Sequence, residues 1–283
     1  MNKVIILTDS TADLNREIRE QYNILSIPLY VRFDDEIYLD GVNLTTEDLY
    51  HKVSEKKIIP KTSAVSPGDF IAFFTKYLVD GYDILYIGIG SKLSATHQSA
   101  VLARDEFADN RIFIVDSQNL SSGIALLVLK ACLLRDQGLS ASEIMKKINL
   151  MVLRVRSQFA IQTLEYLHKG GRASGTAKLF GSILGIKPII RVRNGSLEVY
   201  KKPAGKMSRA LDLMLLDYFN EGENLDLDFV MITHSLANKQ ALYMIEKIKE
   251  KTNPKHVIES KAGCVISSHC GPGTIGILYI VQK

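Results

Sequence analysis

Val4-Ile5-Ile6-Leu7-Thr8-Asp9-Ser10-Thr11 is the stretch of sequence that sets the class of fold. Its first half is a short apolar run typical of a buried β-strand, and its second half is a polar turn. Behind Asp13, a good helix N-cap, Leu14, Ile18 and Tyr22 recur at helical spacing. A strand that leads through a polar turn into a helix is the opening unit of an α/β sheet. In such sheets, polar residues at the carboxyl end of a strand tend to face the ligand.

The same unit recurs twice further along the chain. The apolar run from Ile84 to Ile87 leads into Gly88-Ile89-Gly90-Ser91 and then into a helix. The run from Ile112 to Val115 leads through Asp116-Ser117 into an apolar helix from Ile124 to Leu134. Alternation of strands and helices favours a mostly parallel sheet that carries helices on its faces.

The pattern changes in the second half of the chain. The β-type runs Ile189 to Val192 and Leu197 to Tyr200 flank Asn194-Gly195, which is the strongest short signal for a β-hairpin. Helical and strand-like runs then alternate to the end. We therefore predict a two-domain α/β protein. Residues 1–157 form an N-terminal domain with a mostly parallel sheet flanked by helices, and residues 158–283 form a C-terminal α+β domain with a hairpin.

Composition excludes several classes of protein. The chain has 283 residues, of which 46% are hydrophobic and 23% are charged, as in folded globular proteins of about two domains. The most apolar stretch, Gly123 to Leu134, is shorter than the ~18 residues of a membrane span, so we expect no membrane insertion. A net charge of +4 without a polybasic run gives little support for nucleic-acid binding. Three cysteines and no secretory signal after Met1 predict reduced thiols and a cytoplasmic location.

Two hydroxyl-rich segments are candidates for a binding site. The segment Ser91 to Ser99 places hydroxyls where a strand turns into a helix, whose free N–H groups favour anions. Helix capping by Ser91 or Ser94 accounts for this segment equally well. The segment Pro60 to Pro67 ends in a second cap, but that cap leaves the hydroxyl of Thr62 unexplained.

A third candidate segment runs from Ser267 to Gly276. It contains His269 and the sequence Gly271-Pro272-Gly273, which is typical of close backbone approach. His269 could donate a hydrogen bond or act as a base. Cys264 and Cys270 lie near this histidine, but their spacing matches no common zinc motif and an adjacent His-Cys pair suits a tetrahedral ion poorly. We predict no metal site here.

Catalytic motifs are absent from the sequence. Ser94 and His269, with Asp9 or Asp116, could be assembled into a hydrolase triad, but no serine sits in a Gly-x-Ser-x-Gly elbow. The run Gly88 to Leu93 stops at two glycines, so it is neither a Walker loop nor a dinucleotide fingerprint. A nucleotide-dependent enzyme is therefore not supported.

Taken together, the motifs resemble the DegV family. The first markers are Thr8 to Leu14, Thr62-Ser63 before Pro67, and the Ser-x-Leu-Ser-x-Thr block that begins at Ser91. The later markers are Val115-Asp116-Ser117, Leu164-Glu165-Tyr166-Leu167 with Gly170-Gly171-Arg172, Lys187-Pro188-Ile189-Ile190, and His269-x-Gly271-Pro272-Gly273. They fall in order over nearly the whole chain, so their combination is specific although each alone would be weak.

The resemblance implies a fatty-acid-binding carrier rather than an enzyme, with no cofactor. A long-chain fatty acid such as palmitate would lie in an apolar tunnel, its carboxylate held by Thr62 and Ser94 with His269 close by. The N-terminal domain would carry the carboxylate-binding loops, and the C-terminal domain would help to enclose the acyl chain. In bacteria with a fatty acid kinase, the bound acid is phosphorylated to an acyl phosphate for phospholipid synthesis. The alternatives are a serine-dependent hydrolase of acyl esters and a regulatory nucleic-acid-binding protein.

Two further expectations concern charge and specificity. We expect hydroxyls rather than an arginine to hold the acid, because a buried arginine clamp would reduce the nucleophilicity of the carboxylate toward ATP. Arg172, on its Gly-Gly turn, is instead a candidate for docking an acidic partner surface. The chain carries Ala95 and His97 where the family usually has Gly and Tyr, and Ala173 where it usually has Ile. Ala95 and His97 are expected to alter which acyl chain is preferred.

Overall fold

The first of the two large sheets is parallel throughout and confirms the predicted α/β class. The structure, a computed structural model, describes residues 2–108, 110–172 and 185–283. Polar turns follow the buried strands of this sheet, as the sequence pattern indicates. The strand order is β2-β1-β6-β7. These strands are β1 (Lys3–Asp9), β2 (Ile24–Ile27), β6 (Tyr82–Gly88) and β7 (Ile112–Asp116).

The second large sheet is mixed and has the strand order β10-β9-β8-β13-β11-β12. Only β11 and β12 pair in parallel in this sheet. The predicted hairpin is present, because β9 and β10 pair antiparallel on either side of Asn194 and Gly195. Both turn residues have positive φ, as a tight hairpin turn requires. The strands are β8 (Val155–Ala160), β9 (Ile189–Arg193), β10 (Ser196–Lys201), β11 (Leu225–Ser235), β12 (His256–Lys261) and β13 (Thr274–Val281).

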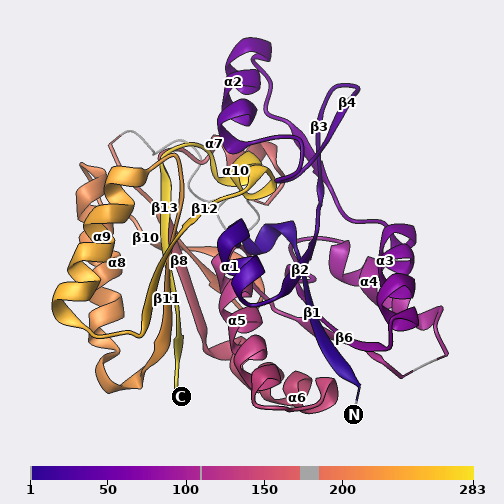
Figure 1. The fold of residues 1–283 in the computed structure, drawn as a ribbon. Helices are drawn as coiled ribbons and strands as arrows, with labels where there is room; N and C mark the ends of the chain where they lie inside the picture. The colour runs from indigo at the N-terminus through magenta and orange to yellow at the C-terminus, as the bar shows by residue number, and fades with distance from the viewer. Residues whose placement is uncertain (1, 109, 173–184) are drawn as a thin grey trace.

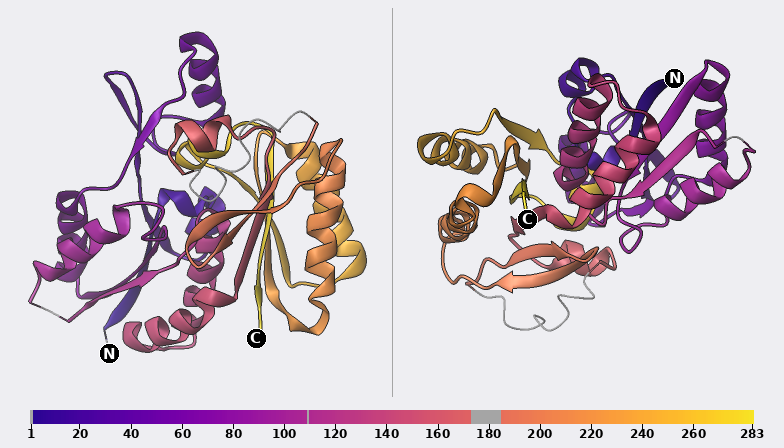
Figure 2. Two further views of the ribbon diagram at one scale, coloured as in Figure 1. Left: turned by 180° about the vertical axis from the view of Figure 1, so that it is seen from behind. Right: turned by 90° about the horizontal axis from the view of Figure 1, so that it is seen from below.

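Helices separate and cover the two large sheets in successive layers (Figure 1). Helices α3 (Pro67–Val79) and α4 (Thr96–Asp105) pack on the outer face of the first sheet. Helices α5 (Ser122–Asp136) and α6 (Ala141–Met151) lie on its inner face. Two views in Figure 2 show α8 (Met207–Asn220) and α9 (Asn238–Lys251) side by side against the far face of the second sheet.

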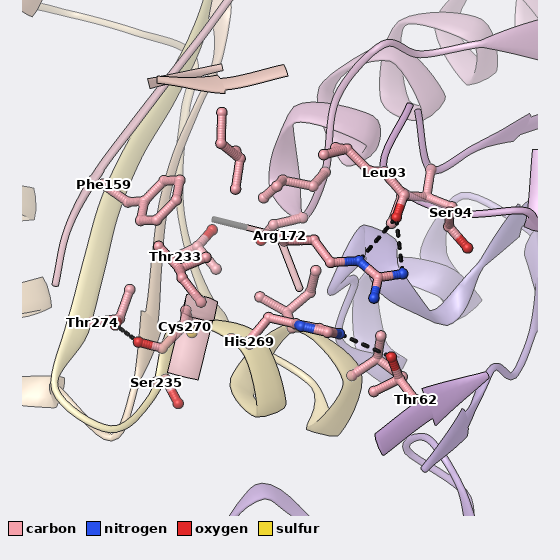
Figure 3. A pocket seen from close by; sticks show the side chains of 18 of the residues that line it. Thr62, Leu93, Ser94, Phe159, Arg172, Thr233, Ser235, His269, Cys270 and Thr274 are labelled. Carbon is pink, nitrogen blue, oxygen red and sulfur yellow. Dashed lines mark hydrogen bonds between the residues drawn. The ribbon is translucent and has the colours of Figure 1, made fainter. Parts of the chain in front are cut away.

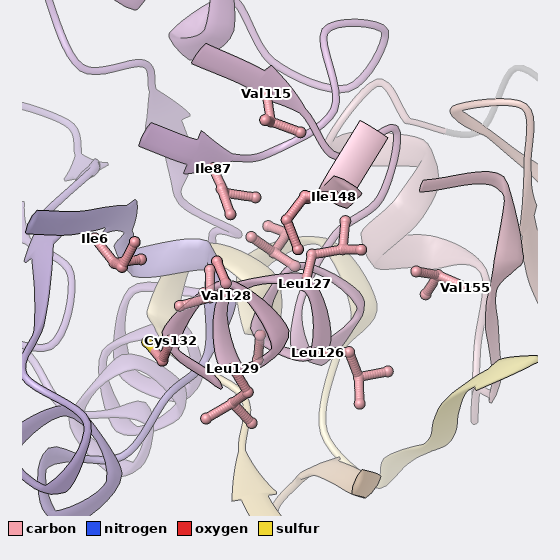
Figure 4. Close-up of a cluster of buried hydrophobic side chains, with 14 of the residues drawn as sticks. Ile6, Ile87, Val115, Leu126, Leu127, Val128, Leu129, Cys132, Ile148 and Val155 are labelled. Carbon is pink, nitrogen blue, oxygen red and sulfur yellow. The ribbon is translucent and has the colours of Figure 1, made fainter. Parts of the chain in front are cut away.

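Helix α5 lies between the two large sheets, which explains its unusual sequence. An ordinary surface helix has one apolar stripe and one polar face. In α5 every residue from Ser122 to Cys132 is buried. One side packs against Ile6 and Ile87 of the first sheet (Figure 4). The other side packs against Met231 and Leu278 of the second sheet. The apolar run that the sequence shows is therefore the shared core of the two halves.

A third, small sheet stands apart from the two large ones and was not predicted. It is antiparallel, with the order β4-β3-β5, and it consists of β3 (Tyr30–Phe33), β4 (Glu36–Leu39) and β5 (Lys61–Ser63). The remaining helices are α1 (Arg16–Gln21), α2 (Thr46–Lys56), α7 (Glu165–Lys169) and α10 (Cys264–Cys270), with short 3-10 turns at Ser10–Ala12, Val152–Arg154 and Gly222–Asn224. Within the described parts of the chain, no helix combines the length and apolar character that a membrane crossing needs.

The second sheet begins close to the predicted domain boundary, although the two halves are closely joined. Strand β8 starts at Val155, three residues before the expected position 158. Helix α10 comes from the C-terminal half of the chain, yet it packs against α2, β3 and β5 of the N-terminal half. The cavity described below lies at this junction.

Candidate functional site

An apolar cavity lies where the first sheet, the second sheet and the small sheet meet. Its volume is about 180 Å³. A single water needs only ~10–15 Å³ of such space, so the cavity has room for a much larger ligand. Side chains from both halves of the chain form its apolar wall, among them Leu29, Ile89, Leu93, Phe159, Leu197 and Leu278.

All four predicted site residues line this one cavity. Thr62 lies on β5, Ser94 on the loop between β6 and α4, and His269 on α10. Arg172 follows α7. Figure 3 shows that Thr62, His269 and Arg172 approach one another at one end of the cavity, while Phe159 lies toward the other. The cavity is therefore polar at one end and largely apolar along its length.

Two acids, the buried Asp9 and the half-buried Asp116, fix the loop that carries Ser94. Asp9, at the end of β1, accepts hydrogen bonds from the Tyr86 hydroxyl at 2.7 Å and from the Ile89 N–H at 2.9 Å. Asp116, at the end of β7, accepts from both the N–H and the hydroxyl of Ser91, at 3.1 and 2.6 Å. These acids follow parallel strands, so they meet at one edge of the sheet. Ser91 therefore anchors the loop rather than capping α4.

The hydroxyl of Ser94 bonds to the first turn of α4. Its Oγ accepts a hydrogen bond from the Thr96 N–H at 3.2 Å and lies 3.0 Å from the Thr96 hydroxyl. The Thr96 hydroxyl oxygen itself accepts from the Val65 N–H at 3.4 Å. If Thr96 donates to Ser94, both lone pairs of the Ser94 oxygen are used and its hydrogen is free. The N-cap position of α4 is Ala95, which makes no side-chain cap bond, so the prediction that Ser91 or Ser94 is the cap is wrong. The bond that Ser94 accepts from the Thr96 N–H is compatible with a binding role for its hydroxyl.

Thr62 and His269 form a direct pair across the cavity end. The Thr62 Oγ1 lies 2.8 Å from Nε2 of His269. Burial, assisted by the nearby Arg172 charge, lowers the pKa of His269 to about 4, so the ring is neutral at pH 7. The other ring nitrogen, Nδ1, is buried without a partner among the described residues and faces Gly170, where an added Cβ would come within 2.1 Å. If Nε2 carries the proton, the Thr62 hydroxyl hydrogen is free to donate.

Arg172 corrects one expectation from the sequence. The acid-binding end was predicted to use hydroxyls without an arginine, but the Arg172 side chain lines the same cavity. Its guanidinium donates to the Leu93 carbonyl at 3.2 Å and to the Gly170 carbonyl at 2.9 Å. Among the described residues, no carboxylate lies within ion-pair distance of this guanidinium. The residues around Arg172 in the sequence do not indicate that its side chain points into the cavity. Docking of an acidic partner at Arg172 stays a prediction.

The hydrogen bonds around Ser94 and His269 do not form the catalytic triad of a serine hydrolase. His269 pairs with Thr62 rather than with Ser94, and its Nδ1 has no acid partner in the described part of the chain. Asp9 and Asp116, the acids considered for a triad, are engaged with the loop of Ser94 as described above. A general base needs an orienting group as well as a nucleophile within hydrogen-bond reach, and no acid orients His269 among the described residues.

Several cavity residues were not predicted. Ser157, Thr233 and Thr274 place hydroxyls on the cavity wall, but these hydroxyls pair inside the protein, for example Ser157 with the Asn119 Oδ1 at 2.8 Å. No sequence motif marks them, because strands of ordinary β composition carry them.

The three departures from the family pattern lie in different surroundings. Ala95 lines the cavity, which keeps it a candidate for acyl-chain preference. His97 is not among the residues that line the cavity. Ala173 lies outside the described residues.

A second hollow of about 410 Å³ adjoins the polar end of the cavity. It shares Leu93, Ser94, Ala95, Arg172 and Leu197 with the cavity, and its other lining residues, Ser91, Lys92, Gly171 and Ser196, are exposed. The polar end therefore lies close to the molecular surface.

The fold and the site define a two-sheet α/β protein with an apolar cavity that ends at polar donors and one arginine. The family model described as an uncharacterised protein of the DegV family matches residues 3–282, and the chain therefore belongs to the DegV family. A DegV domain-containing protein of Clostridium acetobutylicum is 36% identical over 281 residues, which cover 99% of both chains.

Solved structures of DegV proteins share the whole fold. A fatty-acid-binding DegV family protein from Thermus thermophilus matches with a TM-score of 0.93 and 29% identity over all of both chains. A stearic-acid-binding protein from Eubacterium ventriosum matches with a TM-score of 0.85 and 26% identity, over 100% of this chain and 99% of the other. The similarity extends over both large sheets and the junction between them.

Proposed function

We propose that this protein binds one long-chain fatty acid, with the carboxylate among Thr62, Ser94, Arg172 and His269 and the acyl chain along the apolar wall. The observation that carries the proposal is the half-buried Arg172, which lines a largely apolar cavity. Its guanidinium donates to backbone carbonyls and has no carboxylate partner among the described residues. A poorly solvated cation is costly without an anion. A ligand with an anionic head and an apolar body would pair with the guanidinium and fill the apolar part of the cavity. Fatty acid binding by the DegV family protein from Thermus thermophilus and stearic acid binding by the protein from Eubacterium ventriosum support this choice.

The hydroxyl donors would complete the head-group site. As described, bonding to Thr96 leaves the Ser94 hydrogen free, and an Nε2–H tautomer of His269 leaves the Thr62 hydrogen free. Hydrogen bonds to a charged group contribute about 1.5–3 kcal/mol each. These donors and the guanidinium would fix the orientation of the acid.

The acyl chain would supply most of the affinity. Burial of a methylene contributes ~0.8 kcal/mol, so about fourteen methylenes give roughly 11 kcal/mol before association costs. This exceeds what the head-group bonds contribute. Variants at the polar end are therefore expected to change head-group placement more than total affinity.

Mass spectrometry of the purified protein under denaturing conditions tests the binding proposal. We expect a co-purifying long-chain fatty acid in near-equimolar amount, and rebinding of palmitate by the delipidated protein. Arg172→Met keeps the length of the side chain but removes its charge, and should weaken palmitate binding while leaving binding of the matching alcohol unchanged. A protein that carries no acid-headed lipid and does not bind palmitate would exclude the proposal.

We further propose that the protein presents the bound acid to a fatty acid kinase for conversion to an acyl phosphate. The hollow beside Ser94 and Arg172 supports this step, because it places the polar end of the cavity next to exposed residues such as Lys92. The reaction forms a bond between a carboxylate oxygen and the γ-phosphorus of ATP, with ADP as leaving group. Incubation with a bacterial fatty acid kinase, ATP and the palmitate-loaded protein should yield a hydroxylamine-trappable acyl phosphate. If an active kinase forms no acyl phosphate from the loaded protein, the protein binds fatty acid but does not present it to a kinase.

A further inference from the structure

The N-terminal end of α10 is bound by two acids from the other half of the chain. Helix α10 (Cys264–Cys270) lies between β12 and β13 in the sequence. The Gly263 N–H donates to the Asp13 carboxylate at 2.8 Å, and the Cys264 N–H donates to the Asp40 carboxylate at 2.6 Å. Amide groups at the start of a helix have no partner within the helix, so an acceptor from elsewhere must satisfy them.

Both acids are buried and closely fitted. The side chains of Asp13 and Asp40 are 6% and 3% exposed. A Cβ on Gly263 would approach Asp40 Oδ1 to 2.9 Å and Asp13 Oδ1 to 3.3 Å, so only glycine fits without a shift. The second oxygen of Asp13 accepts from the Ser121 hydroxyl. Burial of two carboxylates is expensive, and these bonds to the helix end offset part of that cost.

The opposite end of the same helix carries His269. Its seven residues span about 10 Å and are joined turn by turn by backbone hydrogen bonds. Tyr50 donates to the carbonyl of Ser267 at 3.3 Å, and the hydroxyl of Ser267 lies 2.8 Å from that of Ser235. His269 then reaches Thr62 on β5 at 2.8 Å. Any displacement of the helix at Gly263 would therefore move the imidazole relative to Thr62.

The cavity itself does not explain the N-terminal motif that carries Asp13. None of the residues from Thr8 to Leu14, all of them described, lines the cavity. Asp40 likewise lies outside it. Asp13 and Asp40 instead contact the start of α10, the helix that carries His269 at the polar end of the cavity.

We infer that Asp13 and Asp40 are positioning residues that hold the N-terminal end of α10 on the N-terminal half and thereby fix His269 against Thr62. The importance of this contact for ligand binding rests on the proposed function. The position of the imidazole itself does not depend on that proposal and is measured separately.

The decisive measurement is the imidazole ¹⁵N spectrum of His269 in the full-length, ligand-free protein, assigned with a His269→Gln variant. Asp40→Ala removes the acceptor for Cys264, and Asp40→Asn keeps an acceptor oxygen of the same shape without the charge. We expect Asp40→Ala to shift the ring nitrogen signals and to raise the pKa of His269 toward its ordinary value. We expect Asp40→Asn to restore the native signals. Palmitate affinity should fall about tenfold in Asp40→Ala and less than threefold in Asp40→Asn.

Asp9→Asn is the matched control, because Asp9 is equally buried but bonds to β6 rather than to α10. It should lower stability without moving the His269 signals. If Asp40→Ala is destabilised but retains the native His269 spectrum, Asp40 is merely structural and the inference is wrong. Should Asp40→Ala fail to fold, Gly263→Ala tests the same contact by displacing the helix end. If the wild-type protein does not bind palmitate, the proposed function is wrong. The His269 spectra of the Asp40 variants would still show whether Asp40 positions the imidazole.

Discussion

The Thr62 hydroxyl lies 2.8 Å from Nε2 of His269, although 207 positions separate the two residues in the chain. This pair joins the small sheet of the N-terminal half to helix α10 of the C-terminal half. It closes the polar end of the cavity, beside Arg172 and near Ser94. The site exists only when both halves are assembled.

Removal of both hydroxyls should separate head-group placement from acyl-chain binding. We expect Thr62→Ala with Ser94→Ala to fold normally, because the two side chains are half-buried and neither belongs to the apolar core. Phosphorylation of bound palmitate should fall at least tenfold, and by more than the affinity for palmitate falls, since each donor contributes ~1.5–3 kcal/mol to orientation. Kinase-dependent acyl phosphate formation and calorimetric binding measure the two effects.

Thr75→Ala provides a control for the hydroxyl double variant. Thr75 is exposed on α3 and donates only to the Ile71 carbonyl of its own helix. It should leave both rate and affinity unchanged. Phosphorylation at the native rate in the double variant would show that neither hydroxyl orients the acid.

The fold could be predicted from the sequence where the pattern is local. The apolar run before Thr8 lies within a single strand, and Asn194-Gly195 lies directly between two paired strands. Both patterns involve residues close together in the sequence, so the sequence alone predicts the structures they form. Strand β5 has only three residues, which is too short to show alternation, and the small sheet was missed for that reason. The approach of Arg172 to the cavity depends on how α7 packs against α10. No local signal encodes that packing.

Acid should weaken the protein through His269. Its pKa is about 4 in the folded protein, against an ordinary value near 6.5 in the unfolded chain. Above pH 6.5 both states are neutral. As the pH falls from 6.5 to 4, the unfolded chain takes up a proton that the folded protein does not, so stability falls over this window. The loss attributable to His269 is at most about 3 kcal/mol.

Urea unfolding of the wild type and of His269→Gln between pH 7 and pH 4 measures this loss. Buried carboxyl groups such as Asp13, whose pKa burial raises, titrate as well, so only the difference between the two proteins reports on His269. His51→Gln is the control, because His51 is exposed on α2. Parallel pH curves for the wild type and His269→Gln would contradict the prediction.

Gly170→Ala should disturb the site by steric contact alone. The added Cβ would meet Nδ1 of His269 at 2.1 Å, far inside van der Waals contact. The φ of Gly170 is −76°, a conformation that any residue adopts, so backbone strain does not contribute. We expect displacement of the imidazole from Thr62 and palmitate binding weakened about tenfold. Gly68→Ala in α3, whose Cβ would lie 3.7 Å from the Oγ of Ser66, should bind normally. Equal affinities of the two variants would refute this account.

Lys130 should affect stability without affecting the site. It lies in the buried part of the apolar helix α5 and is 7% exposed, and its ammonium lies 2.6 Å from the Asp226 carboxylate and also contacts Asp228. Lys130→Met would leave these two poorly solvated carboxylates facing each other, although Asp228 keeps a contact with Lys255 at 2.7 Å. Removal of one partner from a buried ion pair costs ~3–5 kcal/mol, and we expect the lower end of that range.

Double replacement of the acids provides the rescue for Lys130→Met. With Asp226→Asn and Asp228→Asn added, the charge that loses its partner at this contact is that of the exposed Lys255, which water solvates, so most of the lost free energy of unfolding should return. Palmitate affinity should match the wild type in all of these variants, because none of the residues of α5, all of them described, lines the cavity. Leu120 and Ser121, which do line it, precede the first turn of α5 and lie far along the helix from Lys130. A Lys130→Met protein as stable as the wild type would show that the ion cluster adds nothing to the junction of the two halves. A loss of palmitate binding that survives the rescue would instead mean that α5 transmits its packing to the cavity.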